Sequence, residues 1–178
     1  MIRIFNLFFI IFFLLSAKAY SLIEIDITRG NLDPLPIAVS PLFQDDNSKR
    51  NSINELKIEN VGSEISLVVE NNLKISGLFN PLSKEAFLQK PDIAHLKPRF
   101  EDWALIKAQA LITGKVTIED KKLKVEFRLW DILAGREMMA LAFTTVPSNW
   151  RRVGHIISDK VYERLTGEKG YFDTRIIY

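Results

Sequence analysis

Three side chains capable of ion pairing or proton transfer recur at four-residue spacing near the end of the chain, namely Arg151, His155 and Asp159. On a helix they would share one face, where an imidazole beside a carboxylate can act as a general base. A small hydrolase built on His155 and Asp159 is one interpretation, but the sequence identifies no nucleophile for it. We favour a structural hydrogen-bonded cluster or a contact with another domain.

Metal and cofactor chemistry have little support in the rest of the sequence. The chain has two histidines and no cysteine, and no H-E-x-x-H spacing, so a zinc site lacks ligands. No G-x-G-x-x-G or P-loop string follows a predicted strand. His95, in a loop between prolines, is interpreted as a surface histidine. We therefore expect no metal, no cofactor and no catalytic residue.

A helix must position Arg151, His155 and Asp159, and the sequence around them predicts one. Its apolar residues fall on a single face, and they are Val153, Ile156, Ile157, Val161 and Leu165. Ser148 or Asn149 can cap the start, and Gly167 suits a left-handed cap at the end. Residues 171–178 then have the composition of a strand.

The first half of the chain predicts strands and one long helix. Residues 23–28 alternate isoleucine with acidic or polar residues, as a half-buried strand does. Residues 37–43 predict a short buried strand, with a turn before it at 31–36 and a solvated loop after it at 44–54. The apolar spacing over 58–75 predicts an amphipathic helix. The helix is expected to end at Gly77. Its seven apolar positions are Ile58, Val61, Ile65, Val68, Val69, Leu73 and Ile75.

The second half predicts an antiparallel meander. Residues 90–98 contain two prolines and are expected to be irregular, and 100–107 predict a brief helix with Trp103 inward. Three strand candidates follow, at 108–118, 123–131 and 137–146. Together these elements predict an α+β domain, with one mixed sheet covered by two or three helices.

The first residues have the features of a cleavable signal peptide. Arg3 precedes an apolar run, and Ala17 and Ala19 supply the small residues that a signal peptidase reads. We expect cleavage after Ala19, which leaves a single exported domain over residues 20–178. The alternative is a membrane anchor, but the run is shorter than the roughly 20 residues that a spanning helix needs. We therefore expect no membrane span after cleavage.

The expected mature chain is electrically neutral. The whole chain has 24 Lys and Arg against 22 Asp and Glu, and the predicted signal holds two of the bases, Arg3 and Lys18. A neutral domain has no general electrostatic attraction to nucleic acid or anionic lipid. The basic residues around 121–128 are interleaved with acids, as on a solvated mixed-charge face. We therefore expect no nucleic-acid partner.

The end of the sequence resembles the TolB family of the Tol-Pal envelope system. The resemblance is carried by W-R-R-x-x-H-x-x-x-D-x-x-Y-E-x-L-T-G-x-K-G-x-F-x-T-R-I from Trp150 onward, with further matches at PIAVSPL and SGLFNPL. It implies the α/β fold of the TolB N-terminal domain, which is similar to an anticodon-binding domain, and a β-propeller following near residue 178. It also implies a periplasmic location with peripheral association with the envelope, and a non-catalytic role in outer-membrane integrity and in envelope constriction at division.

The resemblance assigns partners to two parts of the chain. In TolB proteins the new N-terminus binds the C-terminal domain of TolA, and the residues at that place here are Ser21, Leu22, Ile23, Glu24, Ile25, Asp26, Ile27 and Thr28. Pal binding belongs to the propeller in that family. A contact between the two domains is expected from Arg151, His155, Asp159, Thr174 and Arg175. Two alternatives stay open: periodicity alone favours an ordinary sheet strand at 23–28, and a secreted module without a propeller could share this pattern.

Overall fold

A computed structural model of the chain describes Ile23, Ile25 and residues 33–174. The expected α+β architecture is confirmed, with one mixed sheet in the strand order β3-β1-β4-β5-β6 and β2 paired to β4. The strands are β1 (Leu35–Val39), β2 (Phe43–Gln44), β3 (Phe79–Pro81), β4 (Ala110–Glu119), β5 (Lys122–Asp131) and β6 (Arg136–Thr145). The α-helices are α2 (Asp46–Leu56), α3 (Val61–Ile75), α4 (Pro91–Ala94), α5 (Phe100–Leu105) and α6 (Trp150–Thr166). Single 3₁₀ turns lie at Lys84–Ala86 and Pro147–Asn149.

The meander β4-β5-β6 forms the larger part of the sheet, as the sequence predicts. A two-residue loop joins β4 to β5, and both of its residues, Asp120 and Lys121, have positive φ (49° and 58°). A loop of that kind matches the twist of the two strands. Leu123, Val125, Phe127 and Leu129 alternate along β5 and are all buried, so this strand has one inward face.

The strand β1 starts earlier than expected. Pro36 lies inside it, paired with Asn80 of β3, whereas the sequence places this proline in a turn. A proline lacks only the N–H, and the Pro36 carbonyl still accepts the N–H of Gln109 at 2.9 Å. The proline therefore costs the sheet a single donor.

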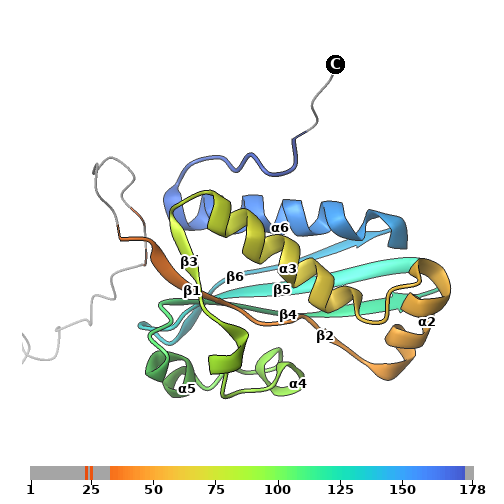
Figure 1. Cartoon of the computed structure of the whole chain (residues 1–178), viewed down its shortest axis with the longest axis horizontal. Helices are drawn as coiled ribbons and strands as arrows, with labels where there is room; N and C mark the ends of the chain where they lie inside the picture. Colours follow the sequence, from red (N-terminus) through yellow and green to blue (C-terminus); the bar gives the residue numbers. More distant parts are fainter. Residues whose placement is uncertain (1–22, 24, 26–32, 175–178) are drawn as a thin grey trace, which may run out of the picture.

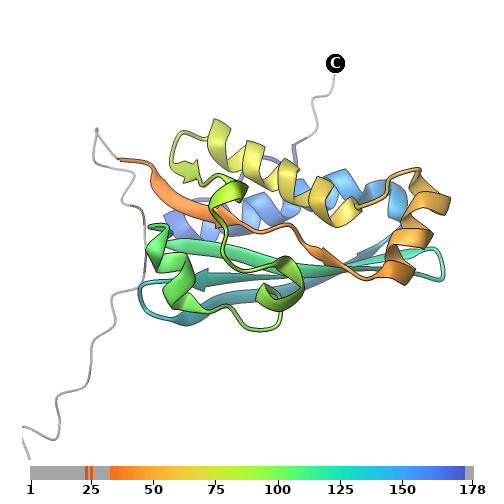
Figure 2. The same ribbon diagram turned by 60° about the horizontal axis from the view of Figure 1, so that its bottom comes forward.

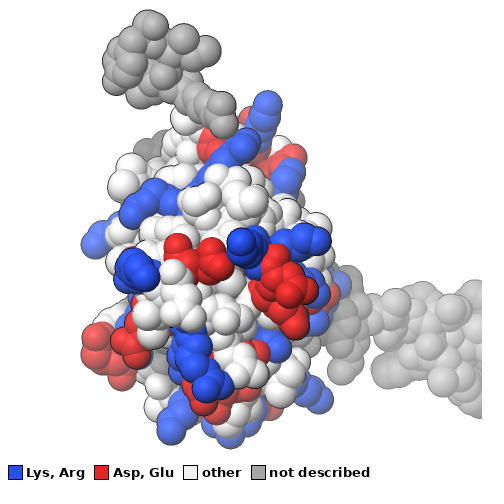
Figure 3. Space-filling model, turned by 90° about the vertical axis from the view of Figure 1, so that its right-hand side faces the viewer, with Lys and Arg blue, Asp and Glu red and all other residues white. Residues whose placement is uncertain are grey.

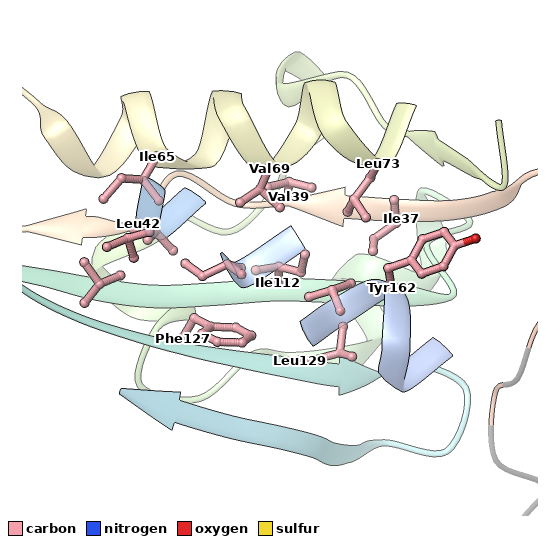
Figure 4. Packing of buried hydrophobic residues seen from close by; sticks show 14 of the residues in the cluster. Ile37, Val39, Leu42, Ile65, Val69, Leu73, Ile112, Phe127, Leu129 and Tyr162 are labelled. Carbon is pink, nitrogen blue, oxygen red and sulfur yellow. The ribbon is translucent and has the colours of Figure 1, made fainter. Parts of the chain in front are cut away.

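Two long helices, α3 and α6, cover one face of the sheet (Figures 1 and 2). Ile65, Val69 and Leu73 of α3 point toward Ile112 of β4 and Phe127 of β5, and all are nearly or fully buried (Figure 4). This apolar layer is the main core of the domain, as the amphipathic spacing predicts. The predicted α3 face is wrong at its end, because Ile75 is 81% exposed.

Short helices cover part of the opposite face. Trp103 of α5 is buried, and its indole N–H donates to Gln89 Oε1 at 3.1 Å. Residues 90–98, expected to be irregular, contain the four-residue helix α4, which starts at Pro91. His95 follows α4 and stacks on Phe43 with ring centroids 4.5 Å apart, so it is half-buried rather than solvated.

The expected loop at 44–54 is wrong, because the chain forms α2 there. Asp45 caps the helix by accepting the Ser48 N–H at 2.8 Å. The interior side of α2 carries Ser48 and Ser52, which are buried although polar. Ser48 Oγ accepts the Ile118 N–H, and Asn51 Nδ2 donates to the Ile118 carbonyl, so α2 packs on β4 through hydrogen bonds. Its inward face therefore gives no apolar period.

Candidate partner-binding surface

Helix α6 contacts both ends of the described part of the chain. It begins at Trp150 and ends at Thr166. The next residue, Gly167, forms the expected C-cap with a left-handed φ of 75° and an N–H bond to the Glu163 carbonyl. The expected N-cap is only partly present. Asn149 is at the cap position but its side chain makes no cap bond, and its amide donates instead to Thr145 Oγ1 at 3.0 Å.

Arg151, His155 and Asp159 each have different partners, so the structure does not join them into a cluster. The Arg151 guanidinium lies 4.6 Å from the centroid of the Trp150 ring and is exposed. His155 bonds to α3, and Asp159 binds the segment that follows α6. The His–Asp pair that a hydrolase would need is therefore absent from this face of α6.

His155 is a structural residue at the contact of α3 with α6. The Ser158 hydroxyl donates to the Gly154 carbonyl at 2.9 Å, so the Ser158 oxygen accepts from the Asn72 amide at 2.9 Å. The same Asn72 Nδ2 lies 2.9 Å from His155 Nδ1, which therefore acts as an acceptor.

The two helices approach closely at Gly154. A Cβ at this position would lie 2.8 Å from Val68 Cγ1 on α3, closer than carbon atoms pack. Only glycine lets α6 come this near to Val68, and the hydrogen bonds of Asn72 lie beside the same crossing. Gly154 thus permits the close approach of α6 to α3 at which His155 contacts Asn72.

Asp159 fixes the segment after α6. Its Oδ1 accepts the Phe172 N–H at 2.7 Å and its Oδ2 accepts the Asp173 N–H at 3.1 Å. Gly170 makes this approach possible, since a Cβ there would lie 2.4 Å from Asp159 Cα. Residues 167–173 consequently double back along α6 (Figure 1). The strand expected to begin at Tyr171 is wrong over 171–174, which have no strand pairing, and 175–178 lie outside the described residues.

Two further contacts of this segment were not expected from the sequence. The Arg152 guanidinium binds both carboxylate oxygens of Asp173, with Nε–Oδ1 and Nη2–Oδ2 distances of 3.1 Å. Its hydrogen bond and ion pair with Asp173 raise the pKa of Arg152. Tyr162 of α6 packs edge-on against the rings of Tyr171 and Phe172, and its burial raises the pKa of its hydroxyl. Thr174, expected at an interdomain contact, follows directly and is exposed.

The N-terminal segment contacts the C-terminal end of α6. The Ile25 N–H donates to the Leu165 carbonyl at 2.7 Å, in the last turn of the helix. The Ile25 side chain is 9% exposed and belongs to the main core, and Ile23 packs against that core while partly exposed. The expected TolA-binding residues outside the described part are Ser21, Leu22, Glu24, Asp26, Ile27 and Thr28, and Arg175 of the interdomain set also lies outside it.

Charge does not single out another site. The end of the molecule seen in Figure 3 carries interleaved acidic and basic side chains. The mixed-charge face expected on the meander is confirmed by the ion pairs Lys124–Glu126 (3.0 Å) and Arg128–Glu137 (3.2 Å). Within residues 33–174, no three His, Asp or Glu side chains come together as metal ligands. In the described part of the chain no helix has the length and apolar character to cross a membrane.

Comparison with known proteins gives the family. Residues 23–138 match the sequence model of the TolB amino-terminal domain. The chain belongs to that family. A Tol-Pal system protein TolB from Pelagibacter ubique (strain HTCC1062) is 76% identical over 170 residues, which cover 96% of this chain and 38% of that TolB. The chain thus spans about two fifths of the length of this relative.

A solved TolB structure confirms the fold. TolB from Acinetobacter baumannii matches with a TM-score of 0.62 at 22% identity, over 79% of this chain and 30% of that one. At this identity the likeness concerns the fold alone.

Proposed function

We propose that this chain is a non-catalytic protein-interaction component of the Tol-Pal system in the periplasm. The observation that carries the proposal is the high identity to a Tol-Pal TolB over nearly the whole chain. Export by a signal peptide over residues 1–19 fits this location. The side chains best suited to catalysis support the same view, because His155 and Asp159 are occupied by structural hydrogen bonds.

The partner-binding segment is proposed to be residues 21–28, with the C-terminal domain of TolA as its partner. Ile23 and Ile25 lie two residues apart and both pack on the core, which is the spacing of an extended chain with one face inward. Glu24 and Asp26 alternate with them in the sequence. An extended segment of this pattern can add to the sheet edge of a partner through its main chain.

A binding experiment tests this assignment. The double variant Glu24→Lys and Asp26→Lys changes the charge of the segment but retains Ile23 and Ile25, which pack on the core. We expect weaker binding to the TolA C-terminal domain in calorimetry, with an unchanged melting temperature. A control variant, Glu55→Lys, reverses an exposed acid on α2 and should bind as the natural chain does. Unchanged TolA affinity of the double variant would contradict the assignment.

The surface around Asp159, Arg151 and Thr174 is proposed to face the next domain of TolB proteins. Supporting this, Asp159 and Arg152 hold residues 172 and 173 against α6, so the chain leaves the domain at a fixed place. We assign Pal binding to the propeller domain of TolB proteins, and the roles in outer-membrane integrity and division to the complete Tol-Pal system. A pull-down with Pal on this chain alone should therefore be negative, whereas one with TolA should be positive.

A further inference from the structure

The outer edge of β6 is a long strand edge that the described part of the chain leaves unpaired. β6 lies at one end of the sheet order and pairs with β5 only. Native proteins protect such edges with charged residues, proline or a short strand. The register skips Met138, and after this bulge residues 139–145 contain no charged residue and no proline. This half of β6 lacks the usual protection.

The hydrogen-bonding groups on this edge can be assigned from the meander. Glu119 and Lys122 flank a two-residue loop, so they exchange main-chain hydrogen bonds. From Lys122 onward along β5, residues that bond to β4 alternate with residues that bond to β6. Phe127 therefore bonds toward β6, to its partner Leu141. Ala140, Ala142 and Thr144 alternate with the β6 residues that bond to β5, so their N–H and carbonyl groups point outward. Each can exchange two hydrogen bonds with an added antiparallel strand.

Side-chain space is also present beside the edge. Met139, Leu141 and Phe143 share the face of the sheet that carries α6, and Leu141 is 37% exposed. A hollow of about 370 Å³ lies between Met139 and the α6 residues Lys160, Glu163 and Arg164. Inward side chains of an added strand would enter this hollow under α6. A second hollow of about 190 Å³, lined by Arg128, Ala140 and Ala142 among others, lies at the middle of the strand.

The charges beside the first hollow favour an acidic occupant. Lys160 pairs with Glu163 at 2.8 Å, and this pair raises the pKa of Lys160 and lowers that of Glu163. Arg164 takes part in none of the ion pairs formed within residues 33–174. The wall of the hollow therefore carries one positive charge that no acidic side chain of the described chain balances.

We propose that the β6 edge binds an extended segment of another protein, in which apolar residues alternate with polar ones and an acidic residue lies beside Arg164. Main-chain bonds to Ala140, Ala142 and Thr144 would provide the pairing, and the alternate apolar side chains would pack with Met139, Leu141 and Phe143. A second copy of the chain fits less well. Its own residues 139–145 are uncharged and bring no acid to Arg164.

The test uses a capped peptide as long as residues 139–145, in which valine alternates with threonine and ends in aspartate. A matched peptide is N-methylated at alternate residues, which removes the main-chain donors of one edge. Amide hydrogen exchange of the purified protein is followed by NMR. We expect the first peptide to slow exchange at Ala140, Ala142 and Thr144 by about tenfold or more, in proportion to its occupancy. The N-methylated peptide should leave these rates unchanged.

Variants separate the main-chain bonds from the charge. Ala142→Pro removes an outward donor and leaves the pairing with β5 intact, so peptide affinity should fall about tenfold or more while the protein stays folded. Ala142→Val retains the N–H and should bind as the natural protein does. Changing the peptide aspartate to asparagine should weaken binding several-fold, and Arg164→Gln should abolish that difference.

Three results would overturn the proposal. The first is binding without the main-chain bonds: either the N-methylated peptide binds as tightly as the first peptide, or Ala142→Pro binds the peptide as tightly as the natural protein does. Another is slow exchange at Ala140 and Ala142 without peptide that increases with protein concentration, because a second copy would then occupy the edge. The third is no binding of any peptide to the folded protein.

Discussion

The carboxylate of Asp159 holds the backbone of Phe172 against α6, with its Oδ1 2.7 Å from the Phe172 nitrogen. This bond, the second one to Asp173 and the Arg152–Asp173 ion pair order the chain after the helix has ended. The N–H of Ile25 binds the last turn of the same helix. The proposed TolA-binding segment and the exit of the chain are therefore positioned by one element.

Removing the Asp159 carboxylate should release this segment. Asp159→Ala leaves two backbone N–H groups without their acceptor, and we expect a loss of about 2 kcal/mol in the free energy of unfolding. Amide exchange at Phe172 and Asp173 should accelerate more than exchange in the core. Glu163→Ala on the exposed side of α6 is the matched control and should leave both amides protected. Equal protection in the two variants would mean that Asp159 does not hold the segment in solution.

Gly154 and Val68 should show coupled effects on stability. Gly154→Ala places a Cβ 2.8 Å from Val68 Cγ1, so we expect overpacking to lower the free energy of unfolding by about 1–3 kcal/mol. Val68→Ala removes the Cγ1 methyl but leaves Val68 Cβ, at 2.9 Å, so the double variant should recover only part of the loss beyond additivity. Urea melts of the single and double variants measure the coupling. Additive losses would show that the helices are not in close contact at this crossing.

The sequence predicts the features of this fold that depend on local residues. The meander follows from the three strand candidates at 108–118, 123–131 and 137–146, and α6 follows from its apolar spacing and Gly167. These predictions are confirmed because the same residues decide both the local conformation and the buried face. The family follows from motifs that local patterning does not explain.

The parts that sequence reasoning missed depend on distant contacts. α2 has two buried serines on its inward side, Ser48, which hydrogen-bonds to β4, and Ser52, so its apolar period is absent. Its one local signal is the Asp45-x-x-Ser48 cap. His155 bonds to Asn72, a residue 83 positions earlier, and no spacing along the chain predicts that pair.

The cap of α2 should make stability depend on pH. The Ser48 N–H bond, with help from Lys115 at 3.7 Å, lowers the pKa of Asp45 in the folded protein. A lowered folded pKa stabilises the fold above the unfolded value of roughly 4, and this contribution is lost as the pH falls through the folded pKa. Asp45→Asn retains a capping side chain but cannot titrate, so the difference in unfolding free energy between it and the natural protein should shrink below roughly pH 4. A difference that stays constant from neutral pH to pH 3 would contradict this.

Asp45→Ala tests the cap itself. It removes the acceptor of the Ser48 N–H and should lower the free energy of unfolding at neutral pH by about 1 kcal/mol. The neighbouring Asp46→Ala changes an exposed acid in the first turn without touching the cap, so it should have a smaller effect. Thermal melts of both variants at neutral pH provide the measurement.

The bond from Ile25 to Leu165 ties the proposed partner-binding segment to the stability of the domain. Ile25→Pro removes both the N–H donor at 2.7 Å and a buried side chain, so we expect a loss of about 2–4 kcal/mol in the free energy of unfolding together with weaker TolA binding. Ile25→Val retains the N–H and should cost about 1 kcal/mol, with TolA affinity nearly unchanged. Comparing the two variants in urea melts and in calorimetry with the TolA C-terminal domain separates the effects of the main chain and the side chain. If Ile25→Pro is as stable as Ile25→Val, the N-terminal segment does not bind α6 in the free protein, and the position proposed for the TolA contact is wrong.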